Sequence, residues 1–177
     1  MAITRRQTLI AAGALAVTGA GGALLWRRQQ QHAAQMQQAA QIGFTRLDGG
    51  TPGTARLADW HGRALLLNFW ATSCSTCVAE MPLLAAIYRE FAGPRFDALA
   101  LAMDYDPPDQ VIAFARSREL PFPVGHDASG EVARAMGPVY LTPTTLLLDA
   151  SGALFRRYLG PPDPAQLRAA IAQITAA

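Results

Sequence analysis

Two cysteines, the only ones in the 177-residue chain, stand three residues apart directly after an apolar run. The run from Leu65 to Trp70 has the composition of a buried strand, and the pattern after Cys74 is that of a helix. Such a junction places Cys74 and Cys77 on one face of the first helical turn, within reach of a disulfide. The unpaired N–H groups and the dipole of a helix N-terminus favour a thiolate over a thiol. The sequence therefore predicts a redox-active pair in which Cys74 attacks a disulfide and Cys77 resolves the mixed disulfide.

Other uses of a Cys-x-x-Cys pair fit this sequence less well. An inert disulfide that closes four residues would constrain the unfolded chain little. Zinc would need two further ligands, and the histidines His32, His61 and His126 stand isolated from one another. Covalent haem attachment needs His directly after the second cysteine, where Val78 stands. We therefore expect no metal and no cofactor besides a redox-active Cys74–Cys77 disulfide.

The N-terminal segments differ in composition from the rest of the chain. In residues 1–28, Arg5 and Arg6 precede an uncharged stretch from Leu9 to Trp26, which predicts an export signal or a membrane anchor. Both the twin-arginine and the general secretory route fit this segment. Residues 29–41 are almost wholly Gln and Ala and predict a stalk or linker, either helical or disordered.

Residues 42–177 form the third segment and hold all 13 acidic residues of the chain. This domain is therefore mildly acidic, and we expect no nucleic acid as a partner. Because this domain follows an export segment, we expect it either to be anchored in the cell inner membrane and face the periplasm, or to be exported and cleaved.

Strand and helix signals alternate from Ile42 onward. Turn residues between β-patterned segments predict one hairpin near the start of the domain and another near its end. The central apolar runs are typical of strands covered on both faces, so we predict an α/β fold with a mixed central sheet flanked by helices. The expected strands are Phe44–Leu47, Thr54–Leu57, Ala64–Trp70, Phe96–Met103, Thr144–Asp149 and Ala153–Leu159, and the expected helices are Ser75–Phe91, Asp106–Leu120, Glu131–Met136 and Pro164–Thr175.

Four ordered motifs resemble the thioredoxin superfamily, and within it the TlpA/ResA-like membrane-anchored thiol:disulfide oxidoreductases. They are Asn-Phe-Trp-Ala-Thr at 68–72, the cysteine pair, Glu-Met-Pro at 80–82, and Leu141 to Asp149. The resemblance covers about residues 42–170. It implies a thioredoxin fold with an N-terminal β-hairpin extension, which this branch adds before the thioredoxin core.

The resemblance also implies roles for individual residues. Pro143 matches the family's cis-proline, beside which the backbone of Thr142 would bind an extended substrate segment. Glu80 matches a functional glutamate that would handle the proton of the resolving cysteine. In thioredoxin a buried Asp serves this purpose, but Asn68 stands at the matching position here and cannot act as a base.

Trp70 and Ser73, which precede the cysteine pair, bear on client recognition. Trp70 is expected to contact substrate, with packing under the active-site helix as the alternative. Most relatives have Trp directly before the first cysteine, whereas this chain has Ser73. The missing indole would remove an apolar cover over the sulfur and part of a partner-docking surface.

The implied function is a protein-disulfide reductase that acts on exported client proteins. Family clients include apocytochrome c, in cytochrome c biogenesis, and copper-site proteins, and a transmembrane thiol electron donor would reduce the pair again. Thr144 follows Pro143 where the cytochrome-maturation branch usually has Glu, which disfavours a dedicated maturation factor. The alternative is a Cu(I)-binding metallochaperone of thioredoxin fold, because two thiolates can hold Cu(I). Its third ligand would be His126, which we expect in a surface turn.

Overall fold

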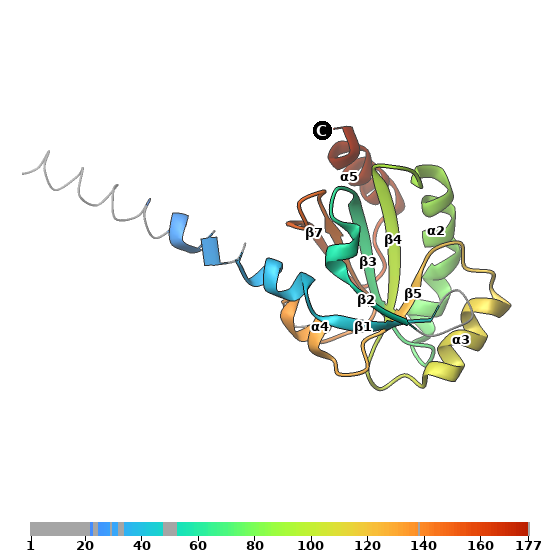
Figure 1. Ribbon diagram of the computed structural model, residues 1–177. Coiled ribbons are helices and arrows are strands. Elements are labelled where there is room, and N and C mark those ends of the chain that lie inside the picture. The colour runs from blue at the N-terminus through green and yellow to red at the C-terminus, as the bar shows by residue number, and fades with distance from the viewer. Residues whose placement is uncertain are drawn as a thin grey trace, which may run out of the picture. The chain divides into compact units, whose positions relative to one another are not determined.

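The computed structural model describes residues 22, 25–28, 30–31, 34–47, 53–137 and 139–176 (Figure 1). The chain divides into two compact units, Met1–Gln35 and Met36–Ala177. The described residues up to Gln35 are helical and exposed. None of the helices in these ranges is both long and apolar enough to cross a membrane. The apolar stretch predicted from Leu9 to Trp26 lies mostly outside the described residues.

The second unit begins earlier than the predicted domain start at Ile42. Residues 36–40 are helical, and Ala39 and Ala40 are buried in the same apolar cluster as Phe44. The last part of the predicted stalk therefore packs on the domain, because its small alanine side chains allow close approach.

A mixed seven-stranded sheet forms the centre of this unit, as predicted (Figure 1). Its strand order is β2-β1-β5-β4-β3-β6-β7. Strands β3, β4 and β5 run parallel, and the N-terminal and C-terminal hairpins add antiparallel strands at the two sides. The strands are β1 (Gly43–Arg46), β2 (Gly53–Arg56), β3 (Ala64–Trp70), β4 (Phe96–Ala102), β5 (Val124–His126), β6 (Thr144–Leu148) and β7 (Leu154–Leu159).

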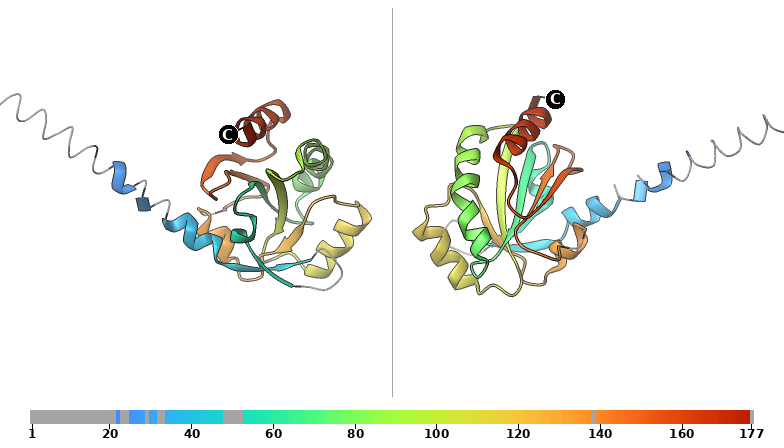
Figure 2. Two further views of the ribbon diagram at one scale, coloured as in Figure 1. Left: turned by 45° about the horizontal axis from the view of Figure 1, so that its top comes forward. Right: turned by 180° about the vertical axis from the view of Figure 1, so that it is seen from behind.

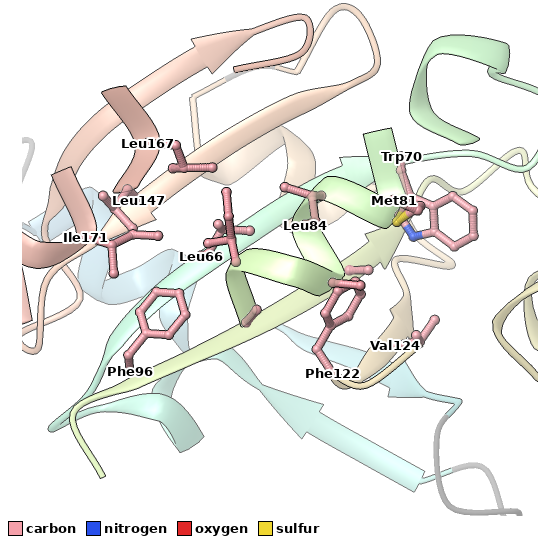
Figure 3. Close-up of a cluster of buried hydrophobic side chains, with 14 of the residues drawn as sticks. Leu66, Trp70, Met81, Leu84, Phe96, Phe122, Val124, Leu147, Leu167 and Ile171 are labelled. Carbon is pink, nitrogen blue, oxygen red and sulfur yellow. The ribbon is translucent and has the colours of Figure 1, made fainter. Parts of the chain in front are cut away.

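Helices cover both faces of the sheet (Figure 2). The side chains of β3 alternate between the faces, as the pleat of a strand requires. Leu66 and Trp70 join the cluster with α2, α3 and α5 (Figure 3), whereas Leu67 and Phe69 join the cluster with η1 and α4. The helices are η1 (Leu57–Trp60), α2 (Ser75–Phe91), α3 (Pro108–Ser117), α4 (Glu131–Ala135) and α5 (Pro164–Ala176).

Strand β5 was not predicted from the sequence. It is three residues long, pairs in parallel with β4 and antiparallel with β1, and so joins the N-terminal hairpin to the core sheet. His126 lies in this strand and is only 6% exposed. The prediction that His126 lies in a surface turn is therefore wrong, because sheet pairing on both sides buries it.

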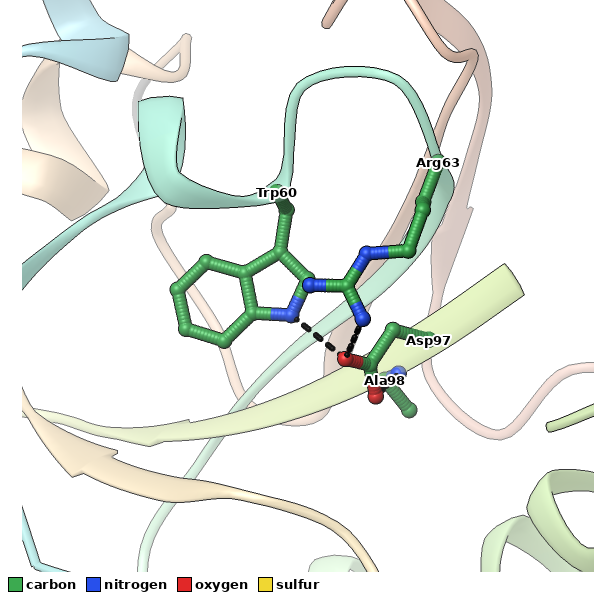
Figure 4. Close-up of polar contacts among 4 residues, drawn as sticks. All are labelled: Trp60, Arg63, Asp97 and Ala98. Carbon is green, nitrogen blue, oxygen red and sulfur yellow. Dashed lines mark hydrogen bonds and ion pairs between the residues drawn. The ribbon is translucent and has the colours of Figure 1, made fainter. Parts of the chain in front are cut away.

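A polar contact holds the chain at the start of β3 and β4 (Figure 4). These strand ends lie away from the cysteines, which follow the other end of β3. The Asp97 carboxylate accepts hydrogen bonds from the Trp60 indole at 3.0 Å and from Arg63 at 2.8 Å. Since Asp97 is largely buried, the paired guanidinium and indole satisfy a charge that would otherwise be costly. The contact ties the segment before β3 to β4.

Candidate functional site

Cys74 and Cys77 form a disulfide at the N-terminus of α2, with their Cα atoms 5.2 Å apart. Cys74 is the N-cap residue, and the backbone N–H of Cys77 donates to its Sγ atom at 3.1 Å. The same N–H would stabilise a Cys74 thiolate in the reduced state. Cys77 is fully buried at 0% exposure, whereas Cys74 is half-buried. A protein substrate can therefore reach the Cys74 sulfur but not the Cys77 sulfur.

The loop before β6 lies against the accessible sulfur. The peptide bond between Thr142 and Pro143 is cis, as the resemblance implied. The carbonyl oxygen of Thr142 is 3.5 Å from Cys74 Sγ. The loop is held in place by hydrogen bonds from the Thr144 hydroxyl to the Leu141 carbonyl and from the Gly160 N–H to the Pro143 carbonyl. A chain segment bound at the Cys74 sulfur would therefore lie beside the backbone of Thr142.

Glu80 lies one turn after Cys77 and is only 4% exposed. Asn68 on β3 donates its side-chain N–H to Glu80 Oε1 at 2.8 Å and also to the Thr145 hydroxyl on β6 at 3.0 Å. Burial raises the pKa of Glu80 from 4.5 to about 7, against the opposing effect of the Asn68 hydrogen bond. Glu80 Oε2 has no hydrogen-bond partner among the described residues and is the open position for a proton. This carboxyl group can take up and release a proton near neutral pH.

Trp70 does not lie where a client could touch it. Its side chain is 0% exposed and packs against Phe114 of α3, with ring centroids 5.1 Å apart. Figure 3 shows its indole beside Met81 of α2. The predicted substrate contact disagrees with this burial, and the packing alternative agrees with it. The reason is the pleat of β3, which turns Trp70 toward the helical layer.

The loop that connects β4 to α3 holds two site residues that the sequence did not indicate. We assigned Asp106 to the start of the helix, but α3 begins at Pro108. The Asp106 carboxylate, 2% exposed, instead accepts the backbone N–H of Thr72 at 2.7 Å and its hydroxyl at 2.6 Å. The neighbouring Tyr105 is exposed and places its hydroxyl 3.5 Å from that of Thr142. No sequence pattern indicates either contact, because the partners lie more than 30 residues apart.

No cluster of three or more His, Cys, Asp or Glu side chains suited to a metal ion occurs in the part of the chain that the structure describes. The site thus consists of a disulfide, a neighbouring carboxyl group and an exposed loop. This set can exchange a disulfide with a partner and move a proton.

Comparison with known proteins agrees with this chemistry. The family profile described as Redoxin matches residues 35–173. The thiol-disulfide oxidoreductase ResA of Bacillus thuringiensis subsp. konkukian is 32% identical over 120 residues, which cover 67% of this chain and 68% of ResA. The thioredoxin-like protein YneN of Bacillus subtilis is 35% identical over 129 residues, 70% of this chain and 71% of YneN.

Solved structures show the same fold. A thioredoxin candidate from Neisseria meningitidis superposes with a TM-score of 0.67 at 33% identity, covering 77% of this chain and 89% of that one. A secreted thiol-disulfide isomerase from Corynebacterium glutamicum has a TM-score of 0.69 at 24% identity, covering 77% and 84%. These likenesses confirm the predicted thioredoxin fold. The Redoxin match and the ResA relatives favour the oxidoreductase over the copper-binding alternative. The chain belongs to the Redoxin family, within the thioredoxin superfamily, and is a ResA-like thiol:disulfide oxidoreductase.

Proposed function

We propose that the protein acts as a reductase of disulfides in exported client proteins. The difference in exposure between the two sulfurs carries this proposal, because it defines which cysteine meets the client. The Cys74 thiolate attacks one sulfur of the client disulfide, a Cys74–client bond forms, and the other client sulfur leaves as a thiolate. The Cys77 thiolate then attacks Cys74 Sγ, which forms the Cys74–Cys77 disulfide and releases the second client thiolate. The two protons lost by the cysteines end on the two client thiols.

Glu80 is the proposed proton acceptor for Cys77. It lies three residues further along α2, so the two side chains share a helical face. Because burial raises the pKa of Glu80 to about 7, the carboxylate and the carboxylic acid are both populated near neutral pH. Asn68 fixes the orientation of the carboxyl group while leaving Oε2 open. Loss of the proton makes Cys77 the nucleophile of the second step.

The client is proposed to bind as an extended segment along Thr142 and Pro143. The Thr142 carbonyl beside Cys74 offers a main-chain acceptor to such a segment. Tyr140 and Leu141 directly precede Thr142 and Pro143, and the Tyr105 hydroxyl lies 3.5 Å from that of Thr142. All three side chains are exposed and would provide a docking surface. They would supply apolar contact area in place of the Trp side chain that most relatives have at the position of Ser73.

The partners and location follow from the N-terminal segment and the relatives. We propose that residues 1–28 export the domain or anchor it in the inner membrane, with the site facing the periplasm. A transmembrane thiol donor would return two electrons to the oxidised pair. Apocytochrome c and copper-site proteins are candidate clients, and Thr144, whose hydroxyl is used internally, favours a broader role than cytochrome c biogenesis alone.

A trapping experiment tests the proposal. Reduced wild-type protein should reduce insulin, and Cys77→Ser should accumulate a mixed disulfide with it, whereas Cys74→Ser should form none. A competition titration with Cu(I) in parallel tests the metallochaperone alternative. Tight Cu(I) binding by a protein that neither reduces insulin nor forms the mixed disulfide would overturn the reductase assignment.

A further inference from the structure

We propose that Asp106 is a positioning residue for Cys74: it latches the segment before the cysteine to the β4–α3 loop, and its negative charge restrains formation of the Cys74 thiolate. This inference rests on the proposed function and adds a control of the attacking sulfur. Asp106 does not belong to the motifs that carry the family resemblance. It acts through Thr72, which lies two residues before Cys74.

The geometry of the latch is specific. Both oxygens of the buried Asp106 carboxylate are used, Oδ2 by the Thr72 N–H at 2.7 Å and Oδ1 by the Thr72 hydroxyl at 2.6 Å. The loop that carries Asp106 is itself bonded to the end of β3, because the Met103 N–H donates to the Trp70 carbonyl and the Asp106 N–H to the Met103 carbonyl. The turn between β3 and α2 is thereby held on a rigid part of the sheet.

The latch also orients the sulfur toward the client-binding loop. Cys74 follows Thr72 by two residues, and its Sγ atom lies 3.5 Å from the Thr142 carbonyl. Two residues span about 7 Å at most, so freedom at Thr72 would pass directly into the position of the sulfur. A displacement of about 1 Å in a reacting group can lower a rate by a large factor.

The charge of Asp106 acts in the opposite direction to the helix terminus. The N–H of Cys77 and the dipole of α2 favour the Cys74 thiolate. The Asp106 carboxylate, which is bonded to Thr72 two residues before Cys74, disfavours a second negative charge nearby. A less stabilised thiolate makes the dithiol the stronger reductant. The other titratable or charged side chains on the elements around the site are Glu80, Tyr88, Arg89 and Glu90 on α2, Asp97 on β4, Asp104 and Tyr105 on the β4–α3 loop, Asp109 and Arg116 on α3, His126 and Asp127 at the end of β5, and Tyr140 before β6.

Asp106→Asn separates the charge from the geometry. The amide oxygen can accept the Thr72 N–H, and the amide nitrogen can donate to the Thr72 hydroxyl, so the latch is kept and the charge is removed. In a Cys77→Ser background, alkylation of Cys74 with iodoacetamide as a function of pH reports the thiol pKa. We expect it to fall by about one unit, which is about tenfold more thiolate at pH values below the pKa. With both cysteines present, the equilibrium with a glutathione buffer should shift toward the reduced protein.

Thr72→Val makes the complementary change. It keeps the Asp106 charge and removes one hydrogen bond, so the Cys74 thiol pKa should not fall, while the rate of attack on insulin should decrease about threefold to tenfold. Asp104→Asn is the matched control, because Asp104 is exposed on the same loop and its carboxylate lies beside Gly130 rather than Thr72. It should leave the thiol pKa unchanged.

The outcomes separate this inference from the proposed function. If the wild type reduces insulin but Asp106→Asn and Asp104→Asn have the same Cys74 thiol pKa as the wild type, the charge effect is overturned and the reductase assignment stands. If the Thr72→Val variant attacks insulin at the wild-type rate, the positioning role of the Asp106–Thr72 contact is overturned. A wild type that reduces no disulfide would overturn both.

Discussion

Glu80→Gln should make the oxidised protein more stable, and the gain should depend on pH. The folded protein holds the Glu80 proton up to about pH 7, whereas the unfolded chain releases it near 4.5, because burial penalises the charged carboxylate. The free energy of unfolding of the wild type therefore decreases as the pH rises from 4.5 to about 7. The difference between the two pKa values corresponds to about 3 kcal/mol. Gln keeps an oxygen for the Asn68 N–H and cannot ionise, so it escapes this loss.

Urea denaturation of both proteins without reductant measures this effect. The free energy of unfolding of the variant, relative to the wild type, should grow by about 1 kcal/mol from pH 4 to 5 and by about 3 kcal/mol from pH 4 to 8. Glu90→Gln on the same helix is the control, since Glu90 is exposed and its ion pair with Arg168 is worth at most about 1 kcal/mol. A stability difference for Glu80→Gln that stays constant from pH 4 to 8 would refute the reasoning.

A kinetic assay of the same variant and two further substitutions test the site and the fold. Stopped-flow measurements with Glu80→Gln at pH 7 should show that release of the client from Cys74 slows about 10-fold to 100-fold while capture changes little; equal effects on both steps would contradict the proton-acceptor role. Gly125→Ala should lower the free energy of unfolding by about 1 to 3 kcal/mol, because a Cβ atom there would lie 2.8 Å from the Phe44 ring; unchanged urea stability would count against this packing. Asp127→Ala should lower the free energy of unfolding by about 2 kcal/mol in the same assay, since the buried carboxylate accepts two backbone N–H groups in the first turn of α4. A loss below about 0.5 kcal/mol would show that water replaces the carboxylate.

The long elements could be predicted from the sequence because local signals define them. Strand β3 and helix α2 have the predicted bounds, Ala64–Trp70 and Ser75–Phe91. A largely apolar run, interrupted only by Asn68, and a helical pattern after the cysteines suffice there. Strand β5 was missed because its three residues carry no periodic pattern, and its pairing with β1 and β4 decides its conformation.

The same distinction between local motifs and long-range contacts applies to the site. The cysteine pair and the cis-proline belong to local motifs, so the sequence indicated them. The bridge from Asn68 to both Glu80 and Thr145 joins a strand, a helix and a second strand, and no spacing along the chain predicts such a contact. Asn68 could be excluded as a base from its chemistry alone, but its role as the support of Glu80 needed the fold. Trp70 shows the reverse, because its motif suggested recognition while its place on the pleat buried it.

The complete burial of Cys77 has a kinetic consequence. Only Cys74 of the pair can be reached from outside, so the client and the proposed electron donor would both react at Cys74, beside the backbone of Thr142. The client and the donor therefore compete for the same sulfur, that of Cys74, and cannot be bound to it at the same time. Steady-state turnover should follow a ping-pong scheme, with parallel lines in double-reciprocal plots, and a large excess of either partner in its non-productive redox state should inhibit the other.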